Sequence, residues 1–164
     1  MPRKVTPVPK GYKTANMVLI VKGADAALSY YEDAFGAEIL SRDYAHDGIT
    51  ILQAEMKIGN TIVRLADEMP EFGILSPTTI GGSPVLIHLY LSDIDTFWTR
   101  VIDSGALAMV ALQDAYWGER FGRFIDPFGH VWNVSKRIEI LTPGEISARA
   151  LTEVETVPAP EQSI

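Results

Sequence analysis

The residues in this 164-residue chain that could do acid–base or metal chemistry include three histidines, at positions 46, 88 and 130. His88 lies in an apolar run, where an imidazole either binds a metal or is partly buried and hydrogen-bonded in the lining of a cavity or core, and the second arrangement is favoured. His46 precedes the turn-forming pair Asp47-Gly48 and is expected in solvent. His130 follows Phe128-Gly129 and is expected to cap that turn. The absence of cysteine excludes disulfides, thiolate nucleophiles and cysteine-ligated metals.

Aromatic side chains are concentrated in one segment of the second half. Alternation along strands predicts that most of them are buried. Tyr116 and Trp117 stand before Gly118 and are flanked by charged residues, which predicts a mobile loop that closes over an apolar ligand. Asp67 and Glu68 are expected at a solvated strand end, without acid–base pairing. The aromatic segment consists of Tyr116, Trp117, Phe121, Phe124, Phe128 and Trp132.

The composition excludes several classes of function. Lysine and arginine number 14 against 21 aspartates and glutamates, and the net charge is −7. This balance argues against a nucleic-acid or anionic-membrane partner and suits a cationic ligand. No apolar run could span a membrane and the N-terminus has no apolar signal region, so the expected location is the cytoplasm. Glycine-rich nucleotide loops, nucleophile elbows and zinc-protease motifs are absent.

The first half of the chain predicts a β-α-β-β-β module. The largely β-branched run at 17–21 predicts a buried strand, and the apolar spacing of 24–35 predicts an amphipathic helix that ends at Gly36. A hairpin is expected around Asp47-Gly48. The three strands that follow the helix are expected at 38–44, 50–57 and 61–66.

The second half repeats this order. A strand at 85–91 is expected to precede a helix that Asp93 caps and Gly105 ends. Gly59 and Gly129 are 70 positions apart, and the apolar helix positions repeat at the same offset, so we expect an internal duplication and an α+β domain. The remaining strands are expected at 107–112, 120–125 and 130–135.

These patterns place a single domain at 14–137, flanked by two tails. Its modules are expected at 14–69 and 84–137, joined by a connector at 70–83 that is rich in glycine and proline. The prolines of 1–13 predict an extended arm. In the tail at 138–164, a capping-box pattern predicts a short helix near 143–152, and residues from 157 onward are expected to be disordered.

Five motifs in order resemble the vicinal oxygen chelate superfamily, which holds glyoxalase I, extradiol dioxygenases and fosfomycin- and bleomycin-resistance proteins, and within it the PhnB-like branch. The resemblance covers roughly residues 11–137. It implies tandem β-α-β-β-β modules that form a curved mixed sheet around a cavity, commonly in a homodimer. The motifs are Phe35-Gly36-Ala37, Leu65-Ala66-Asp67-Glu68, Gly81-Gly82-Ser83-Pro84, Trp117-Gly118-Glu119-Arg120 and the run from Asp126 to Trp132.

Active members of that superfamily hold a divalent metal with histidine, glutamate or glutamine ligands at matching places in the two modules. Counting along this sequence puts Asn16, Val63 (or Arg64), Leu86 and Asn133 at those places. Neutral amides and aliphatic side chains cannot neutralise a dication, so we expect no metal and no other cofactor. The two asparagines are expected either to bind a ligand or to bond to each other or to the backbone. Arg64 is expected either in solvent or as an anion-binding group.

The favoured function is a metal-free protein that binds a small aromatic or cationic molecule in the cavity of a homodimer, as the bleomycin-resistance branch does by sequestration. The alternative is a metal-dependent lyase, isomerase or dioxygenase in which His88, together with acidic side chains from elsewhere in the chain, forms a displaced ligand set. A third possibility is a structural or regulatory partner protein. The expected ligand-binding residues are Asn16, Arg64, Leu86, His88, Tyr116, Trp117, Phe121 and Asn133.

Overall fold

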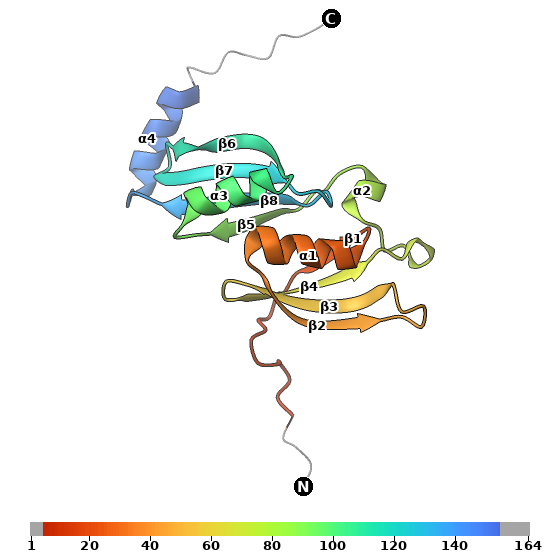
Figure 1. The fold of residues 1–164 in the computed structure, drawn as a ribbon. Helices are drawn as coiled ribbons and strands as arrows, with labels where there is room; N and C mark the ends of the chain where they lie inside the picture. Colours follow the sequence, from red (N-terminus) through yellow and green to blue (C-terminus); the bar gives the residue numbers. More distant parts are fainter. Residues whose placement is uncertain (1–4, 155–164) are drawn as a thin grey trace, which may run out of the picture.

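The structure, a computed structural model, describes residues 5–154 and contains two modules of the same β-α-β-β-β order (Figure 1). The sequence-predicted disorder after residue 157 lies outside the described residues. The first module consists of β1 (Val18–Val21), α1 (Ala24–Phe35), β2 (Glu38–Tyr44), β3 (Ile51–Ile58) and β4 (Thr61–Asp67). The second consists of β5 (Leu86–Tyr90), α3 (Ile94–Asp103), β6 (Leu107–Ala115), β7 (Glu119–Ile125) and β8 (Val131–Arg137).

Each module forms its own four-stranded mixed sheet, in the order β1-β4-β3-β2 and β5-β8-β7-β6. In both sheets the first and last strands of the module pair in parallel, and the other pairs are antiparallel. The predicted α+β fold and the internal duplication are therefore confirmed. One detail differs from the expectation: the chain forms two four-stranded sheets, whereas one curved sheet was expected.

The two modules share one hydrophobic core, built from the helix-facing side of each sheet. α1 packs against α3, and the ring of Phe35 lies 5.2 Å from that of Phe97 and 4.8 Å from that of Trp132. Leu65 of β4 and Val134 of β8 belong to the same cluster of buried side chains. Because strands alternate, the opposite face of each sheet carries the intervening residues.

Polar contacts reinforce the junction of the two modules. Tyr31 Oη of α1 donates a hydrogen bond to Asp126 Oδ2 at 2.5 Å, and Trp132 Nε1 donates to the same oxygen at 2.8 Å. Arg100 Nε of α3 donates to the carbonyl oxygen of Ala34 at 2.7 Å. Burial and the charge of Asp126 raise the pKa of Tyr31, which keeps its phenol protonated as a donor.

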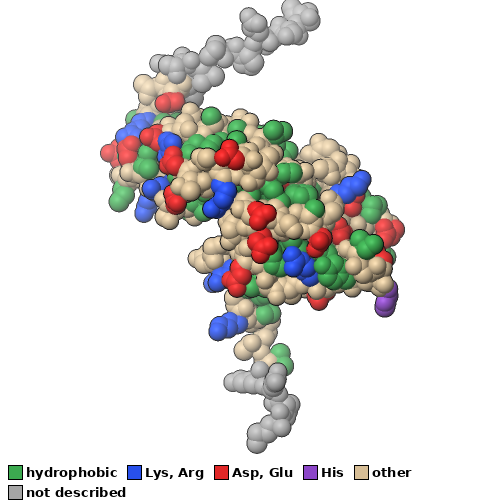
Figure 2. Space-filling view, viewed as in Figure 1, with side chains coloured by type: hydrophobic (Ala, Val, Ile, Leu, Met, Phe, Trp, Pro, Cys, Tyr) green, Lys and Arg blue, Asp and Glu red, His purple; other side chains and the backbone are tan. Residues whose placement is uncertain are grey.

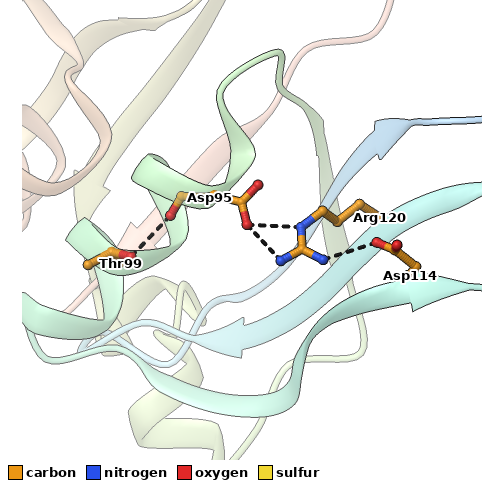
Figure 3. A network of polar contacts seen from close by, with 4 residues as sticks. All are labelled: Asp95, Thr99, Asp114 and Arg120. Carbon is orange, nitrogen blue, oxygen red and sulfur yellow. Dashed lines mark hydrogen bonds and ion pairs between the residues drawn. The ribbon is translucent and has the colours of Figure 1, made fainter.

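The helix-facing side of the second sheet also carries an arginine clamp (Figure 3). Arg120 donates from Nε and Nη2 to Asp95 Oδ1 in α3, at 2.9 and 2.6 Å, and from Nη1 to Asp114 Oδ1 in β6 at 3.0 Å. Asp95 and Asp114 are both exposed, so the clamp contributes modestly to stability. It ties α3 to the sheet and belongs to no site on the other face.

The adjacent carboxylates at the end of β4 have structural roles. Asp67 Oδ1 accepts hydrogen bonds from the backbone N–H groups of Gly23 and Ala24 at the start of α1, and Oδ2 accepts one from Ile51. Glu68 accepts hydrogen bonds from the backbone and hydroxyl of Ser76, and these contacts lower its pKa to about 2. The expectation that this pair is simply solvated was wrong, because Asp67 is bonded to backbone groups up to 44 positions away and Glu68 to Ser76 in the connector.

The helix α3 begins where the sequence predicted, with Asp93 as its N-cap residue. The side chain of Asp93 forms no capping hydrogen bond, however, so the cap position is confirmed without the carboxylate contact. The helix ends at Asp103 with Ser104 as its C-cap residue, so the cap lies one residue before the predicted Gly105.

The connector is more ordered than its glycines and prolines suggested, whereas the tail helix forms as predicted. The connector contains a 3₁₀ turn, η1 (Pro70–Phe72), and a one-turn helix, α2 (Pro77–Ile80). The tail forms α4 (Pro143–Val154), where Thr142 and Glu145 exchange the predicted capping contacts. No helix among the described residues is long and apolar enough to cross a membrane.

Candidate functional site

The face of the second sheet that lies away from the shared core collects most of the predicted site residues. Trp132 and Val134 are in the core, so the alternation of β8 places Asn133 on the opposite side. By the same alternation, Leu86 and His88 of β5 lie on this side of the sheet, away from the core. We call this side the β5–β8–β7 face and define it by Leu86, His88, Tyr90, Asn133, Arg123, Phe121 and Glu119.

Three polar side chains lie in a row across the middle of this face. β5 pairs His88 with Asn133 of β8, and β7 pairs Arg123 with the same Asn133. Arg123 Nε donates a hydrogen bond to Asn133 Oδ1 at 2.8 Å. Asn133 is only 9% exposed, whereas His88 is exposed. The expectation that His88 is partly buried was therefore wrong, because the described chain leaves this edge of the sheet uncovered.

An aromatic row lies next to the polar row. The ring of Phe121 is 5.3 Å from that of Trp117 and 6.5 Å from that of His88, and the His88 and Tyr90 rings are 4.8 Å apart. The Arg123 guanidinium carbon lies 5.9 Å from the Phe121 ring centre. The two rows give a polar strip along one side of an aromatic surface, which is the combination that orients small organic ligands.

Glu119 holds the aromatic row in place. Its two carboxylate oxygens accept hydrogen bonds from Tyr90 Oη at 2.9 Å and Trp117 Nε1 at 3.0 Å. Desolvation raises the pKa of Glu119, but its polar neighbours Ser135, Trp117 and Tyr90 and the nearby charge of His88 outweigh it, and the net pKa is lowered. Glu119 is consequently ionised at neutral pH, with both oxygens engaged by the protein.

The Tyr116-Trp117 segment is a tight turn. It joins β6 to β7 through three residues, the last being Gly118 with a φ of 84°, a conformation that favours glycine. The carbonyl oxygen of Gly118 accepts hydrogen bonds from Ile138 and Glu139 at 3.0 Å each. The segment is therefore a turn anchored to the residues that follow β8, whereas the sequence predicted a mobile loop that closes over a ligand. The length of the turn and its final glycine were the sequence signals for this outcome.

The first sheet carries the remaining predicted residues and does not match the second. β1 pairs Val18 with Arg64 of β4, the counterpart of the His88–Asn133 pair. Val63 is 1% exposed and lies in the core, so its assignment to the site was wrong. Asn16 is exposed before β1 and exchanges hydrogen bonds with the backbone of Lys13, at 2.9 and 2.6 Å. Asn16 is therefore engaged by the backbone, one of the two outcomes expected for it.

Part of the N-terminal arm covers Arg64. The guanidinium carbon lies 4.8 Å from the ring centre of Tyr12, and Nε donates to the Tyr12 hydroxyl at 3.2 Å. The same hydroxyl donates to Glu55, which also lies 3.5 Å from Arg64 Nε. The positive charge of Arg64 is thus already compensated, and the arm, at Tyr12, packs on the sheet.

The residues counted at the metal positions do not fit a divalent metal, because Asn16, Arg64, Leu86 and Asn133 offer two amides, one guanidinium and one aliphatic side chain. The strand pairs of the structure set Val18 beside Arg64 and His88 beside Asn133, which adds one imidazole and no carboxylate. A guanidinium repels a dication and an aliphatic group cannot coordinate it. Across residues 5–154, no group of three or more His, Cys, Asp or Glu side chains is placed to hold a metal ion.

An apolar groove of about 330 Å³ lies between β1, the connector and the start of β5. Val18, Leu75, Ile80 and Val85 contribute to its lining, and His130 lies at its wall. His130 Nε2 contacts the carbonyl oxygen of Ile20 in β1 at 3.0 Å. The prediction that His130 caps its own turn was wrong, because the carboxylate of Asp126 accepts the backbone N–H groups of that turn. His46 lies exposed at the β2–β3 hairpin, as expected.

The structure therefore brings together five of the eight predicted residues, adds three and leaves three elsewhere. Leu86, His88, Trp117, Phe121 and Asn133 meet at the β5–β8–β7 face. Asn16 and Arg64 lie with the first sheet, and Tyr116 lies in the turn with its ring against Trp117. Sequence reasoning missed Tyr90, Glu119 and Arg123. Their two-residue spacing from His88 and Phe121 was the available signal, because residues i and i+2 of a strand share a face.

Comparisons with known proteins agree with this architecture. Residues 13–134 match the family model described as the Glyoxalase/Bleomycin resistance protein/Dioxygenase superfamily. Two uncharacterized mycobacterial proteins, Rv0887c of Mycobacterium tuberculosis and Mb0911c of Mycobacterium bovis, are each 36% identical over 133 residues. That span is 79% of this chain and 78% and 87% of the respective relatives.

Solved structures show the same fold. TioX from Micromonospora sp. ML1 has 25% identity and a TM-score of 0.58, covering 75% of this chain and 98% of its own. The fosfomycin resistance protein FosX from Listeria monocytogenes, solved with Mn(II) and sulfate, has 14% identity and a TM-score of 0.59, with 84% and 97% covered. At that identity FosX supports the fold alone. This chain belongs to the Glyoxalase/Bleomycin resistance protein/Dioxygenase superfamily.

Proposed function

We propose that this protein is a metal-free binding protein that holds a small aromatic molecule against the β5–β8–β7 face. A second copy of the chain, in a homodimer, would complete the cavity. The observation that carries the proposal is the surface formed by Tyr90, Trp117 and Phe121 beside the polar row, in a module that retains the superfamily fold. Sequestration of the molecule, rather than its conversion, is the expected activity.

The chemistry at the metal positions supports binding without a metal. His88 is the one ordinary metal ligand among the four paired positions. The nearest carboxylate of the aromatic row, Glu119, already accepts hydrogen bonds on both oxygens. A displaced ligand set of the kind that a metal-dependent lyase, isomerase or dioxygenase needs would have to break those contacts.

Exposed apolar side chains support the homodimer. Leu86 and Tyr90 of the β5–β8–β7 face are 46% and 68% exposed, and Val18, across the groove in the first sheet, is 55% exposed. Apolar groups grouped in this way at uncovered sheet edges are typical of surfaces that a partner covers. The superfamily resemblance supplies the choice of a second copy as that partner.

An aspartate at position 86 should dissociate the dimer. Leu86→Asp would introduce a charge into the covered surface, and we expect sedimentation equilibrium to give the mass of one 18.0 kDa chain for the variant and twice that mass for the native protein. Leu151→Asp is the matched control, because Leu151 is 72% exposed on α4 and should not alter the mass. A monomeric native protein would contradict the dimer.

Metal analysis separates the proposal from its enzymatic alternative. Protein purified without chelator should contain far less than one equivalent of zinc, nickel, iron or manganese by mass spectrometry, and His88→Ala should leave that content unchanged. A stoichiometric metal that His88→Ala removes would establish a displaced ligand set and overturn the metal-free proposal.

A further inference from the structure

Arg123 has hydrogen-bond donors that the described chain does not use. Its Nε is bonded to Asn133, but within residues 5–154 no carboxylate lies within ion-pairing distance of its guanidinium. Its two terminal nitrogens have no hydrogen-bond partner in that range. By contrast, Arg64 and Arg120 are each paired with glutamate or aspartate.

The partial burial of Arg123 makes its unpaired guanidinium unfavourable unless a ligand is bound. Its side chain is half-buried between Asn133 and Phe121, each 9% exposed. Partial burial removes water from a charge, and a guanidinium so placed normally finds a carboxylate or phosphate. A bound anion would supply the missing partner, because the two terminal nitrogens can contact both oxygens of a carboxylate in a planar fork.

The neighbouring side chains favour an anion with an aromatic or apolar body. Asn133 and His88 lie beside Arg123 in the polar row, and neither carries a negative charge. The negative charge of Glu119 is held by Tyr90 and Trp117 at the far side of the aromatic row. On the other side of the polar row lie Leu86, Val131 and Ile125.

We propose that the β5–β8–β7 face selects small organic carboxylates with an aromatic or apolar body, with Arg123 binding the carboxylate. This inference rests on the proposed function and refines it. Asn133 fixes the guanidinium through Nε, and the rings of Phe121 and Trp117 contact the body of the ligand. The net charge of −7 suggested a cationic ligand, but the local charge at the polar row is positive, and the local charge decides which ligand binds.

Three probes of the same shape test the charge preference. We would measure by calorimetry, at low salt, the binding of 3-phenylpropanoate, 3-phenylpropan-1-ol and 3-phenylpropylammonium to the full-length native protein. The expected result is that the carboxylate binds about tenfold more tightly than the alcohol and that the ammonium binds most weakly. Equal or tighter binding of the alcohol or the ammonium would overturn the inference and leave the proposed function standing. Failure of all three to bind would overturn both.

Two substitutions test the role of Arg123. In Arg123→Gln the preference for the carboxylate over the alcohol should disappear while the alcohol still binds, and Arg123→Lys should retain part of the preference. Arg42 pairs with Asp25 in the first module, and Arg42→Gln makes the same change of charge there. This control variant should retain the full preference for the carboxylate over the alcohol. Melting curves establish that each variant is folded. A carboxylate preference that survives Arg123→Gln would overturn the assignment.

Discussion

Replacing Asp126 with alanine should lower the free energy of unfolding by about 3–5 kcal/mol. Asp126 is 4% exposed. Its Oδ1 accepts hydrogen bonds from the backbone of Phe128 and His130, and its Oδ2 accepts them from Tyr31 and Trp132. The substitution would leave buried donors from both modules without partners, and each such donor costs about 1–3 kcal/mol. Urea denaturation of the native protein and the variant measures the loss.

Two further variants check the cause of that effect. Tyr31→Phe removes one of the four hydrogen bonds and should cost about 1–2 kcal/mol. Asp33→Ala removes a carboxylate from the exposed side of α1, where Figure 2 shows acidic side chains in solvent, and should change stability by less than about 0.5 kcal/mol. An Asp126→Ala variant no less stable than Tyr31→Phe would show that the carboxylate does not organise this junction.

A valine at position 122 should destabilise the protein by about 1–3 kcal/mol or more. Gly122 lies in β7 directly beneath α3, and a Cβ atom there would lie 2.5 Å from Trp98 Cζ3. The absence of a side chain at this position lets the indole of Trp98 rest on the sheet, so any larger residue forces the helix or the ring to move. Thermal and urea unfolding should both report the loss.

The contact with Trp98 can be isolated by a double-mutant cycle. If the collision with the indole is the cause, Gly122→Val should cost much less in a Trp98→Leu background than in the native one, with a coupling of about 1 kcal/mol or more. Additive effects would place the cause elsewhere in β7. The single variant Trp98→Leu provides the reference for the loss of indole packing.

Most of the fold could be predicted because it depends on local periodicity. The apolar spacing of 24–35 and the alternation of the strands identified both modules, and the 70-residue offset identified their duplication. The tail helix was predictable from its capping pattern at Thr142 and Glu145.

The site was harder to predict because a shift of one residue moves a side chain to the other face of a strand. The offset between modules is 70 residues for Val18 and His88 but 69 for Arg64 and Asn133, so counting with one offset selected the buried Val63. The role of Asp67 was equally hidden, since its backbone partners at Gly23 and Ala24 are 44 and 43 positions away.

The common interior of the two modules has a consequence for the origin of the chain. A half-length ancestor with only the first module would have exposed Phe35 and Tyr31, which are now enclosed by Phe97, Phe124 and Trp132 of the other half. Such an ancestor would have needed a second polypeptide against its helix to remain folded. The two halves therefore depend on each other for folding, whereas the outer sides of their sheets are independent and carry different residues, Val18 and Arg64 in one and His88 and Asn133 in the other.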